Sequence, residues 1–367
     1  MKRKTKGNKI LYFYAVRMSF VAKDIEILNQ RFRVAEYHFN TRVKWKIPLQ
    51  FIRQLLYVLK NTRSSYAVVC FFSGYHSFLP AIAGKIFKKP VLIFIGGSDA
   101  YAYPSFHYGH FNKFLIGRFT CLSARMADLL LPVDECLMFS ESDYYTAEES
   151  IQGIRHFCKK LNTPHRTIRL EYDPTLFFNR AKNKRENSFI TAAFGIEGTS
   201  FIRKGIDMVI EVAHLLPDCH FSVIGCSRDA IRVPVSENVH FIPPVPYKDL
   251  AGIYSTHRFY LQMSIAEGFP SAICEAMLCE CVPIGSNVAA IPFIIGETGF
   301  IVNKRDVLLL KEVIGFACRR EDLEDMGQRA RERIIGNFYP GSRSKPLFEL
   351  LDEAPSLIRR SGKGSQD

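Results

Sequence analysis

Two glutamates eight positions apart are the residues best suited to chemistry in this sequence. Glu267 stands in a Glu-Gly-Phe-Pro turn after the strand-like run 259–263, and Glu275 stands inside the apolar stretch that follows. Pro270 suits the first turn of a helix that begins near Ser271, because its missing N–H costs nothing there. The start of such a helix presents free N–H groups and a positive dipole end, which favour a phosphate.

Glu275 is predicted just over one turn inside this helix, on a largely apolar stretch. A buried carboxylate is costly unless something hydrogen-bonds it, and ligand hydroxyls can do so. The pattern therefore predicts a site for a compound that carries both phosphate and hydroxyls. The alternative is an ordinary turn followed by a solvent-facing glutamate, and the nine residues alone favour neither interpretation.

The composition indicates two globular domains: 367 residues, 47% hydrophobic and 23% charged. The longest stretch without a charged residue, 64–84, is interrupted by a polar loop and Pro80, which predicts strand, loop and helix rather than a membrane span. The apolar run 10–16 after the basic start is stopped by Arg17, so a buried strand is expected there and not a signal peptide. Ten cysteines without a Cys-x-x-Cys pair favour free thiols in a reducing compartment, the cytoplasm.

Positive charge is concentrated in the first half of the chain. Residues 1–180 hold 27 Lys and Arg against 13 Asp and Glu, whereas 181–367 hold 22 against 23. Residues 1–63 alone have 15 basic and 3 acidic side chains. This asymmetry predicts an anionic partner for the first domain: a membrane surface, a phosphorylated substrate or nucleic acid.

Strand-like and helix-like segments alternate along both halves. In the first half, strands are predicted at 9–15, 34–39, 67–72, 91–95, 128–132 and 168–171, and helices at 23–32, 47–61 and 79–87. In the second half, strands are predicted at 189–194, 220–225, 239–242, 259–263 and 282–285, and helices at 206–216, 248–255, 271–279, 307–319 and 323–338. This rhythm is typical of parallel sheets covered by helices on both faces.

The fold class expected is therefore α/β, with two Rossmann-like domains whose parallel sheets face a cleft. Residues 1–178 form the acceptor-binding domain, 179–187 a basic linker and 188–338 the second domain. Residues 339–367 are expected to pack back on the first domain and to end in a disordered tail. Ligands of such sheets bind at the carboxyl ends of the strands, which places the site in the cleft.

The run Ser264-x-x-Glu267-Gly-Phe-Pro-x-x-x-x-Glu275-Ala-Met resembles the signature of the retaining, nucleotide-sugar-dependent glycosyltransferases of the GT-B fold, the group 1 or GT4-like family. Further segments stand in the family's order. They are Arg203-Lys204-Gly205-Ile206-Asp207, 221–225, 282–286 and 296–302, with weaker matches at 97–99 and 171–177. The resemblance is good over 189–302 and faint over 1–180.

The resemblance implies a role for each motif residue. Glu275 would hold the ribose hydroxyls of the nucleotide, and Glu267 would lie beside the donor sugar and its anomeric centre. Arg203 and Lys204 would neutralise the diphosphate leaving group, as cations do for phosphate charge. Further donor contacts are expected from Gly268, Phe269, Ser271, Ala272 and Gly225.

No metal or other cofactor is expected. The chain has no Asp-x-Asp pair, which disfavours the metal-dependent glycosyltransferase fold. Lys204 and Arg203 would supply the electrostatic stabilisation that a metal gives there.

Three departures from the family pattern bear on the donor. Arg203 adjoins Lys204, whereas the family has a separate arginine several residues earlier, near Glu197 here. The run Ala289-Ala290-Ile291-Pro292-Phe293 replaces the usual Gly-Gly-x-Pro-Glu, which leaves donor placement open. The segment 17–20 stands where the family has a glycine-rich loop after its first strand.

Four residues of the first domain are candidates for acceptor contact. Asp99 follows the strand 91–95, and His76 follows the strand 67–72. His107 and His110 could position the acceptor or act as a general base. The alternatives are a helix cap for Asp99 and structural roles for the three histidines.

Residues 42–63 form a basic amphipathic segment. Arg42, Lys44 and Lys46 precede the helix 47–61, whose apolar residues are expected to pack into the core; these are Ile52, Leu55, Leu56 and Leu59. Its basic face is expected to touch anionic lipid, as an interfacial helix does. Nucleic acid is not the expected partner.

The leading hypothesis is a hexosyltransferase that moves a sugar from a nucleoside-diphosphate sugar to a glycan or lipid-linked acceptor with retention of configuration. It would work in the cytoplasm, peripherally on the inner face of the membrane. The alternatives are a catalytically silent GT-B-fold binding or scaffold protein at a membrane or nucleic acid surface, and a related phosphorylase or epimerase.

Overall fold

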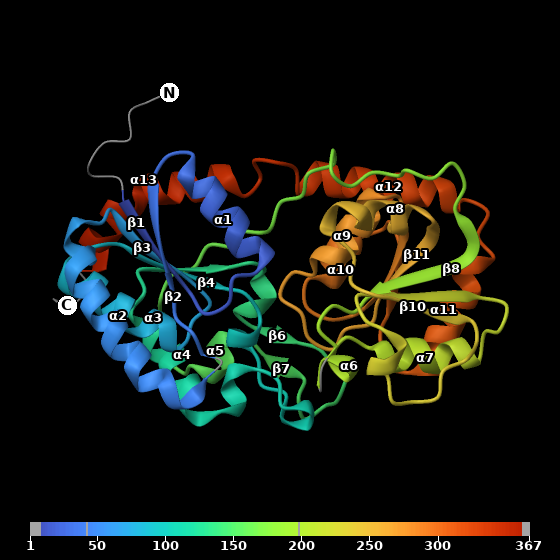
Figure 1. The fold of residues 1–367 in the computed structure, drawn as a ribbon, viewed down its shortest axis with the longest axis horizontal. Helices are drawn as coiled ribbons and strands as arrows, with labels where there is room; N and C mark the ends of the chain where they lie inside the picture. The colour runs from blue at the N-terminus through green and yellow to red at the C-terminus, as the bar shows by residue number, and fades with distance from the viewer. Residues whose placement is uncertain (1–8, 42, 197–198, 362–367) are drawn as a thin grey trace.

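The computed structural model describes residues 9–41, 43–196 and 199–361, which form two α/β domains side by side (Figure 1). Arg42, Glu197 and residues 362–367, which belong to the end of the chain where a tail is expected, lie outside the described residues. The first sheet has five parallel strands in the order β2-β1-β3-β4-β5. The strands are β1 Lys9–Tyr14, β2 Arg33–His38, β3 Ala67–Phe71, β4 Val91–Ile95 and β5 Leu129–Pro132.

The inner strands β3 and β4 are continuous apolar runs and are buried along their whole length. This composition is expected of parallel strands that helices cover on both faces. The helices of this domain are α1 Ser19–Asn29, α2 Ile47–Asn61, α3 Tyr75–Ile86, α4 Phe114–Met126 and α5 Ile154–Phe157. A small hairpin joins β6 Ser140–Glu141 and β7 Ile151–Gln152.

The predicted strand at 168–171 is wrong. Ile168 donates a backbone hydrogen bond of 2.9 Å to Pro132 at the end of β5, but the segment joins no sheet. The only bridge nearby among the described residues pairs Leu130 with His165. The segment therefore runs beside the edge of the sheet without extending it.

The second domain has six parallel strands in the order β10-β9-β8-β11-β12-β13. They are β8 Arg185–Ala192, β9 His220–Ile224, β10 Val239–Ile242, β11 His257–Gln262, β12 Val282–Ser286 and β13 Phe300–Val302. The helices are α6 Ser200–Arg203, α7 Ile206–His214, α8 Leu250–Ser255, α9 Ser271–Leu278, α10 Ile291–Ile295, α11 Val307–Cys318 and α12 Leu323–Asn337. β8 begins at Arg185, inside the predicted linker 179–187.

After α12 the chain returns to the first domain as α13, Ser344–Ser361 (Figure 1). Arg343 is fully buried and binds both carboxylate oxygens of Asp24 on α1, at 2.6 and 2.8 Å. Tyr66 adds a hydrogen bond of 2.8 Å to the backbone oxygen of Leu351. A buried charge needs a partner with good geometry, so this pair fixes the return of the chain.

The helix α2 spans the predicted residues, but the apolar face that was expected to be buried is exposed. Ile52 and Leu56 expose 58% and 65% of their surface, and Leu55 and Leu59 are also exposed. The buried residues of α2 include Gln54, whose amide donates a hydrogen bond of 2.8 Å to the backbone oxygen of His76. The expectation that this apolar face packs into the core is therefore wrong.

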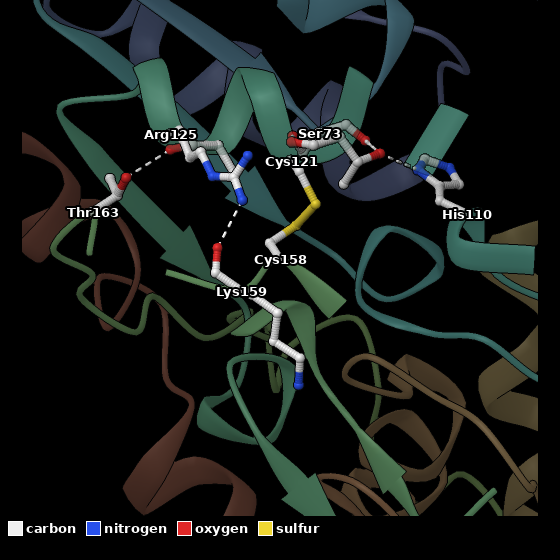
Figure 2. Close-up of a disulfide and its surroundings, with 9 residues drawn as sticks. Ser73, His110, Cys121, Arg125, Cys158, Lys159 and Thr163 are labelled. Carbon is white, nitrogen blue, oxygen red and sulfur yellow. Dashed lines mark hydrogen bonds between the residues drawn. A yellow bond between two sulfur atoms is a disulfide. The ribbon is translucent and has the colours of Figure 1, made fainter. Parts of the chain in front are cut away.

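One pair of cysteines departs from the expectation of free thiols. Cys121 on α4 and Cys158, next to α5, form a disulfide, and the other eight cysteines are free. Figure 2 shows Arg125 beside the disulfide, where its guanidinium donates a hydrogen bond of 2.7 Å to the backbone oxygen of Lys159. These bonds fix α4 to the segment after α5. In the described part of the chain, no helix is both long and apolar enough to cross a membrane.

Candidate active site

Glu267 lies in the loop between β11 and α9, among donors from two segments of the second domain. Its carboxylate accepts hydrogen bonds from the Lys204 ammonium at 2.6 Å and the Ser264 hydroxyl at 2.9 Å. A guanidinium nitrogen of Arg203 lies 3.8 Å away. Burial alone would raise the pKa of Glu267, but the charges of Lys204 and Arg203 outweigh it and hold that pKa below its ordinary value.

A glycine brings the two cations to this glutamate. Gly205, between α6 and α7, has a φ of +70°, and a β-carbon there would lie 2.1 Å from the Met263 backbone oxygen. Only glycine allows the turn to lie this close to the end of β11. Arg203 then accepts a backbone hydrogen bond from Ile265 at 2.8 Å and donates from its side chain to the Ala266 oxygen at 3.2 Å.

Gly268 forms the contact between the two domains. A β-carbon at this position would lie 2.0 Å from the backbone oxygen of Gly96, which follows β4. The Gly268 backbone thus lies against the Gly96-Gly97 loop of the first domain. This contact sets Glu267 at the boundary of the domains.

Tyrosines of the first domain complete this region, and sequence reasoning missed them. The Tyr101 hydroxyl donates a hydrogen bond of 2.6 Å to the backbone oxygen of Glu267. The Tyr103 hydroxyl donates one of 3.4 Å to the backbone oxygen of Ile265. The Arg203 guanidinium lies 4.8 Å from the centre of the Tyr108 ring. The concentration of aromatic residues at 101–108, directly after β4 and its loop, could have indicated them.

Glu275 lies on the second turn of α9 and is almost fully buried. Its carboxylate accepts a hydrogen bond of 2.8 Å from the hydroxyl of Tyr247. Tyr247 was not among the residues predicted from the sequence. Burial raises the pKa of Glu275 to about 7, against the Tyr247 hydrogen bond and the charge of Lys23 on α1. Lys23 and Glu275 both line a cavity of about 20 Å³, which is too small for a nucleoside.

The remaining donor-site candidates surround the start of α9. The Ser271 hydroxyl accepts a hydrogen bond of 3.1 Å from the Tyr172 hydroxyl, and Ala272 is half-buried in the first turn of α9. Phe269 is buried, with its ring 6.5 Å from that of Tyr172. Pro270 stands just before the helix, not in its first turn as predicted. No side chain caps the N–H groups in the first turn of α9.

Gly225 and the altered 289–293 run are also placed by the structure. Gly225 follows β9 with a φ of +101°, and a β-carbon there would lie 2.7 Å from the Phe194 ring. Phe293, which stands where the family has a glutamate, lies under the Arg169 guanidinium at 4.1 Å. That position therefore offers an aromatic ring covered by a cation instead of a carboxylate.

Asp99 connects two loops at the carboxyl edge of the first sheet. One carboxylate oxygen accepts from the N–H groups of Gly96 and Gly97, each at 3.0 Å, and the other accepts from Ser73 at 2.9 Å. Burial raises the pKa of Asp99 to about 6, although these N–H groups oppose the rise. Asp99 therefore fixes the loop of Ser73 to the loop of Gly97.

The three candidate histidines separate into two groups. His76 lies in the first turn of α3, not in a loop as predicted. Its Nε2 donates a hydrogen bond of 2.7 Å to the backbone oxygen of Phe71. His110 contacts Thr120 through Nδ1 at 3.1 Å (Figure 2). Burial lowers the pKa of His76 to about 4 and that of His110 to about 3, so both are neutral at pH 7. Both line one cavity, whereas His107 is exposed and is not among its lining residues.

Residues 196–317 match the family model described as "Glycosyl transferases group 1". O-antigen chain mannosyltransferase B of Escherichia coli is 33% identical over 69 residues, 19% of this chain and 18% of that protein. Trehalose synthase of Pyrococcus horikoshii is 36% identical over 95 residues, 25% of this chain and 22% of that protein. The chain thus spans about a fifth of the length of these curated relatives.

Solved structures match over most of the chain. Sucrose-phosphate synthase from Thermosynechococcus elongatus superposes with a TM-score of 0.69 at 13% identity, covering 94% of this chain and 98% of that one. The Anabaena protein HepE in complex with UDP and glucose superposes with a TM-score of 0.68 at 13% identity, covering 94% and 100%. At these identities the likeness shows the fold of both domains.

Proposed function

From a chain with the GT-B fold, whose residues 196–317 match the group 1 glycosyltransferases, we propose a glycosyltransferase that uses a nucleoside-diphosphate sugar. The observation that carries the proposal is the cluster that the buried Glu267 forms with the half-buried Lys204 and Arg203 at the domain contact. A carboxylate for sugar hydroxyls and two cations for phosphate are what such a donor requires. The UDP complexes of the structural neighbour HepE support the choice of donor.

Lys204 and Arg203 act on the leaving group. As the bond between the anomeric carbon and the diphosphate oxygen breaks, negative charge grows on the diphosphate. Fixed cations and the N–H groups at the start of α9 stabilise that charge without reorganisation. We therefore propose catalysis without a metal, which full activity in excess EDTA would support and loss of activity restored by Mg²⁺ would contradict.

Glu267 serves as an ionised carboxylate rather than an acid. Because Lys204 and Arg203 keep its pKa low, it holds no proton for a leaving group at neutral pH. It is suited to accept sugar hydroxyls and to stabilise positive charge at the anomeric carbon. Glu275, with its raised pKa, is suited to two ribose hydroxyls, whose hydrogen bonds would compensate its burial.

We propose that the configuration at the anomeric carbon is retained. The acceptor hydroxyl would form its new bond on the face that the diphosphate leaves, and would pass its proton to a diphosphate oxygen. The engagement of Glu267 with Lys204 supports this route over a covalent glycosyl-enzyme, because a paired carboxylate is a weaker nucleophile. Proton NMR of the first product formed from an α-linked donor tests it: a β-linked product would refute retention.

The enzyme is proposed to work at the inner face of a membrane. The exposed apolar residues of α2 are flanked by Arg53 and Lys60, a pattern suited to the interface of an anionic bilayer. Eight free cysteines support a reducing compartment, the Cys121–Cys158 pair being the exception. Flotation with anionic and neutral vesicles tests the membrane contact, and equal binding to both at low salt would argue against it.

A catalytically silent binding protein is the second candidate. Phe293 favours it, because a ring under Arg169 replaces the carboxylate that the family has near the donor. The two candidates differ in turnover and not in the fold.

Thermal-shift measurements with UDP-, GDP-, ADP- and CMP-sugars, followed by donor hydrolysis, test the function. We expect one donor to raise the melting temperature and to be hydrolysed slowly. Binding without hydrolysis or transfer would favour the silent protein, and no binding at all would refute the proposed function. Lys204→Ala should lower turnover, and Lys311→Ala, on the exposed face of α11, is its matched control.

A further inference from the structure

A cavity of about 780 Å³ opens at the carboxyl edge of the first sheet. Its walls come from the segments after β1, β3 and β4 and from the first turns of α2, α3 and α4. This volume is that of a small-molecule site. The motif residues Glu267, Lys204 and Glu275 are not among its lining residues, so it is separate from the donor cluster.

The walls of this cavity are mainly apolar. Val16, Met18, Ile47, Phe72, Phe114 and Leu115 line it, and none of the described residues that line it is Asp or Glu. Among the described residues that line it, Lys113 is the only Lys or Arg, and the imidazoles of His76 and His110 are neutral. Such a cavity suits an apolar chain next to a negatively charged group.

The outer end of the cavity continues into an exposed apolar surface. Phe114 and Leu115, on the first turn of α4, expose 73% and 61% of their surface. Phe51 of α2 packs on Phe119 of α4 with ring centres 5.4 Å apart, so the two helices lie side by side. Trp45, just before α2, is 77% exposed.

The charge around this surface has one sign. The sequence contains no acidic residue between Glu36 and Asp99, a stretch that includes all of α2 and α3. On α4, Arg118 and Arg125 are exposed beside the apolar residues. An apolar surface surrounded by cations is complementary to an anionic lipid surface and disfavours an acidic or purely polar partner.

The inner end of the cavity approaches the donor cluster. Ser98 lines the cavity and adjoins Gly97 in the chain. A β-carbon at Gly97 would lie only 3.4 Å from the backbone nitrogen of Gly268. The cavity thus ends one residue along the chain from Gly97, which packs near Gly268, the residue after Glu267.

We propose that this cavity is the acceptor site and that the acceptor is an anionic amphiphile, a lipid with a phosphate head taken from the membrane on which α2 lies. The apolar walls hold the part of the chain next to the head, Lys113 binds the phosphate, and the inner end presents the accepting hydroxyl to Glu267. This inference rests on the proposed function and adds to it the chemical class and the residues of the acceptor site.

Binding of farnesyl phosphate to the full-length protein, measured by calorimetry without any donor, tests the inference. We expect saturable binding, weaker binding of farnesol, and no competition by millimolar inorganic phosphate. Leu115→Glu and Val16→Glu place a carboxylate on two different walls at exposed positions and should weaken binding about tenfold or more. Lys113→Gln should remove the preference for farnesyl phosphate over farnesol.

Leu308→Glu is the matched control, since Leu308 is equally exposed on α11 of the second domain. It should bind farnesyl phosphate like the wild type. Equal weakening by Leu308→Glu, competition by inorganic phosphate alone, or no saturable binding would overturn the inference. Nucleotide binding in the same preparation separates the outcomes: if it persists while farnesyl phosphate fails to bind, only the acceptor assignment falls.

Discussion

The replacement Glu275→Gln should stabilise the ligand-free protein, and increasingly so as the pH rises. The pKa of Glu275 rises from an ordinary 4.5 to about 7 because of burial. At about 1.4 kcal/mol for each tenfold change in an equilibrium constant, this rise costs the ionised form about 3 kcal/mol. Glutamine keeps an acceptor for the Tyr247 hydroxyl, which lies 2.8 Å from the carboxylate, but carries no charge.

The sign follows from the direction of the pKa change. A carboxyl group whose pKa is higher in the folded state contributes fully below pH 4.5, and its contribution is lost as the pH rises towards 7. The advantage of the glutamine variant should therefore stay under about 1 kcal/mol at pH 5 and approach about 3 kcal/mol at pH 8. For a domain of this size, the difference corresponds to about 5–10 °C in melting temperature.

Melting of wild type and variant by differential scanning fluorimetry, at half-unit steps from pH 5 to pH 8, measures this effect. Glu312→Gln, at an exposed position of α11, is the control and should follow the wild type at every pH. Subtracting wild-type values removes the titration of all other groups. A difference in melting temperature that stays constant over this range would refute the account of Glu275 as a carboxylate held against its burial.

Three further predictions concern the cluster, the domain contact and the returning helix. Lys204→Ala should lower kcat about a hundredfold or more in steady-state transfer assays, and a nearly unchanged kcat would remove its role in leaving-group stabilisation. Gly268→Ala would press a β-carbon onto Gly96 and should lower kcat/KM on the order of a hundredfold while calorimetry still detects nucleotide binding. Arg343→Ala should cost about 3–5 kcal/mol in urea unfolding by leaving Asp24 buried and unpaired; a loss under about 1 kcal/mol would contradict that.

The residues around Glu267 were predicted partly from local chain geometry and partly from the resemblance to the group 1 glycosyltransferases. Glu267 and Glu275 belong to one loop and helix, and the Lys204-Gly205 turn lies at the end of the neighbouring strand. Parallel strands bring such loops to one edge of a sheet, but the expectation that Lys204 lies near Glu267 came from the resemblance to the family and not from spacing along the chain. The biochemical roles of these residues stay predictions.

Contacts between segments far apart in the sequence could not be predicted in the same way. Tyr101 and Tyr247 reach the two glutamates from segments far away in the sequence, and no spacing links them. The disulfide joins Cys121 and Cys158 across 37 residues with no motif to indicate it.

Periodicity identified α2 but not its inner face. Ile52 and Leu56 do share one side of the helix, as predicted, yet that side faces outwards. The inner side contains Gln54, which the His76 backbone satisfies. A pattern of 3.6 residues tells which residues share a face, and only tertiary contacts decide which face is buried.

The return of α13 to the first domain has a consequence for synthesis on the ribosome. The buried residues Leu347 and Leu351 belong to α13, and the partner of Asp24 is Arg343, so the first domain lacks one layer until these residues exist. Domains usually fold in order as they emerge. Here the amino-terminal domain, although made first, cannot finish folding until the entire second domain has been translated, and its uncovered face would be a binding site for chaperones during that interval.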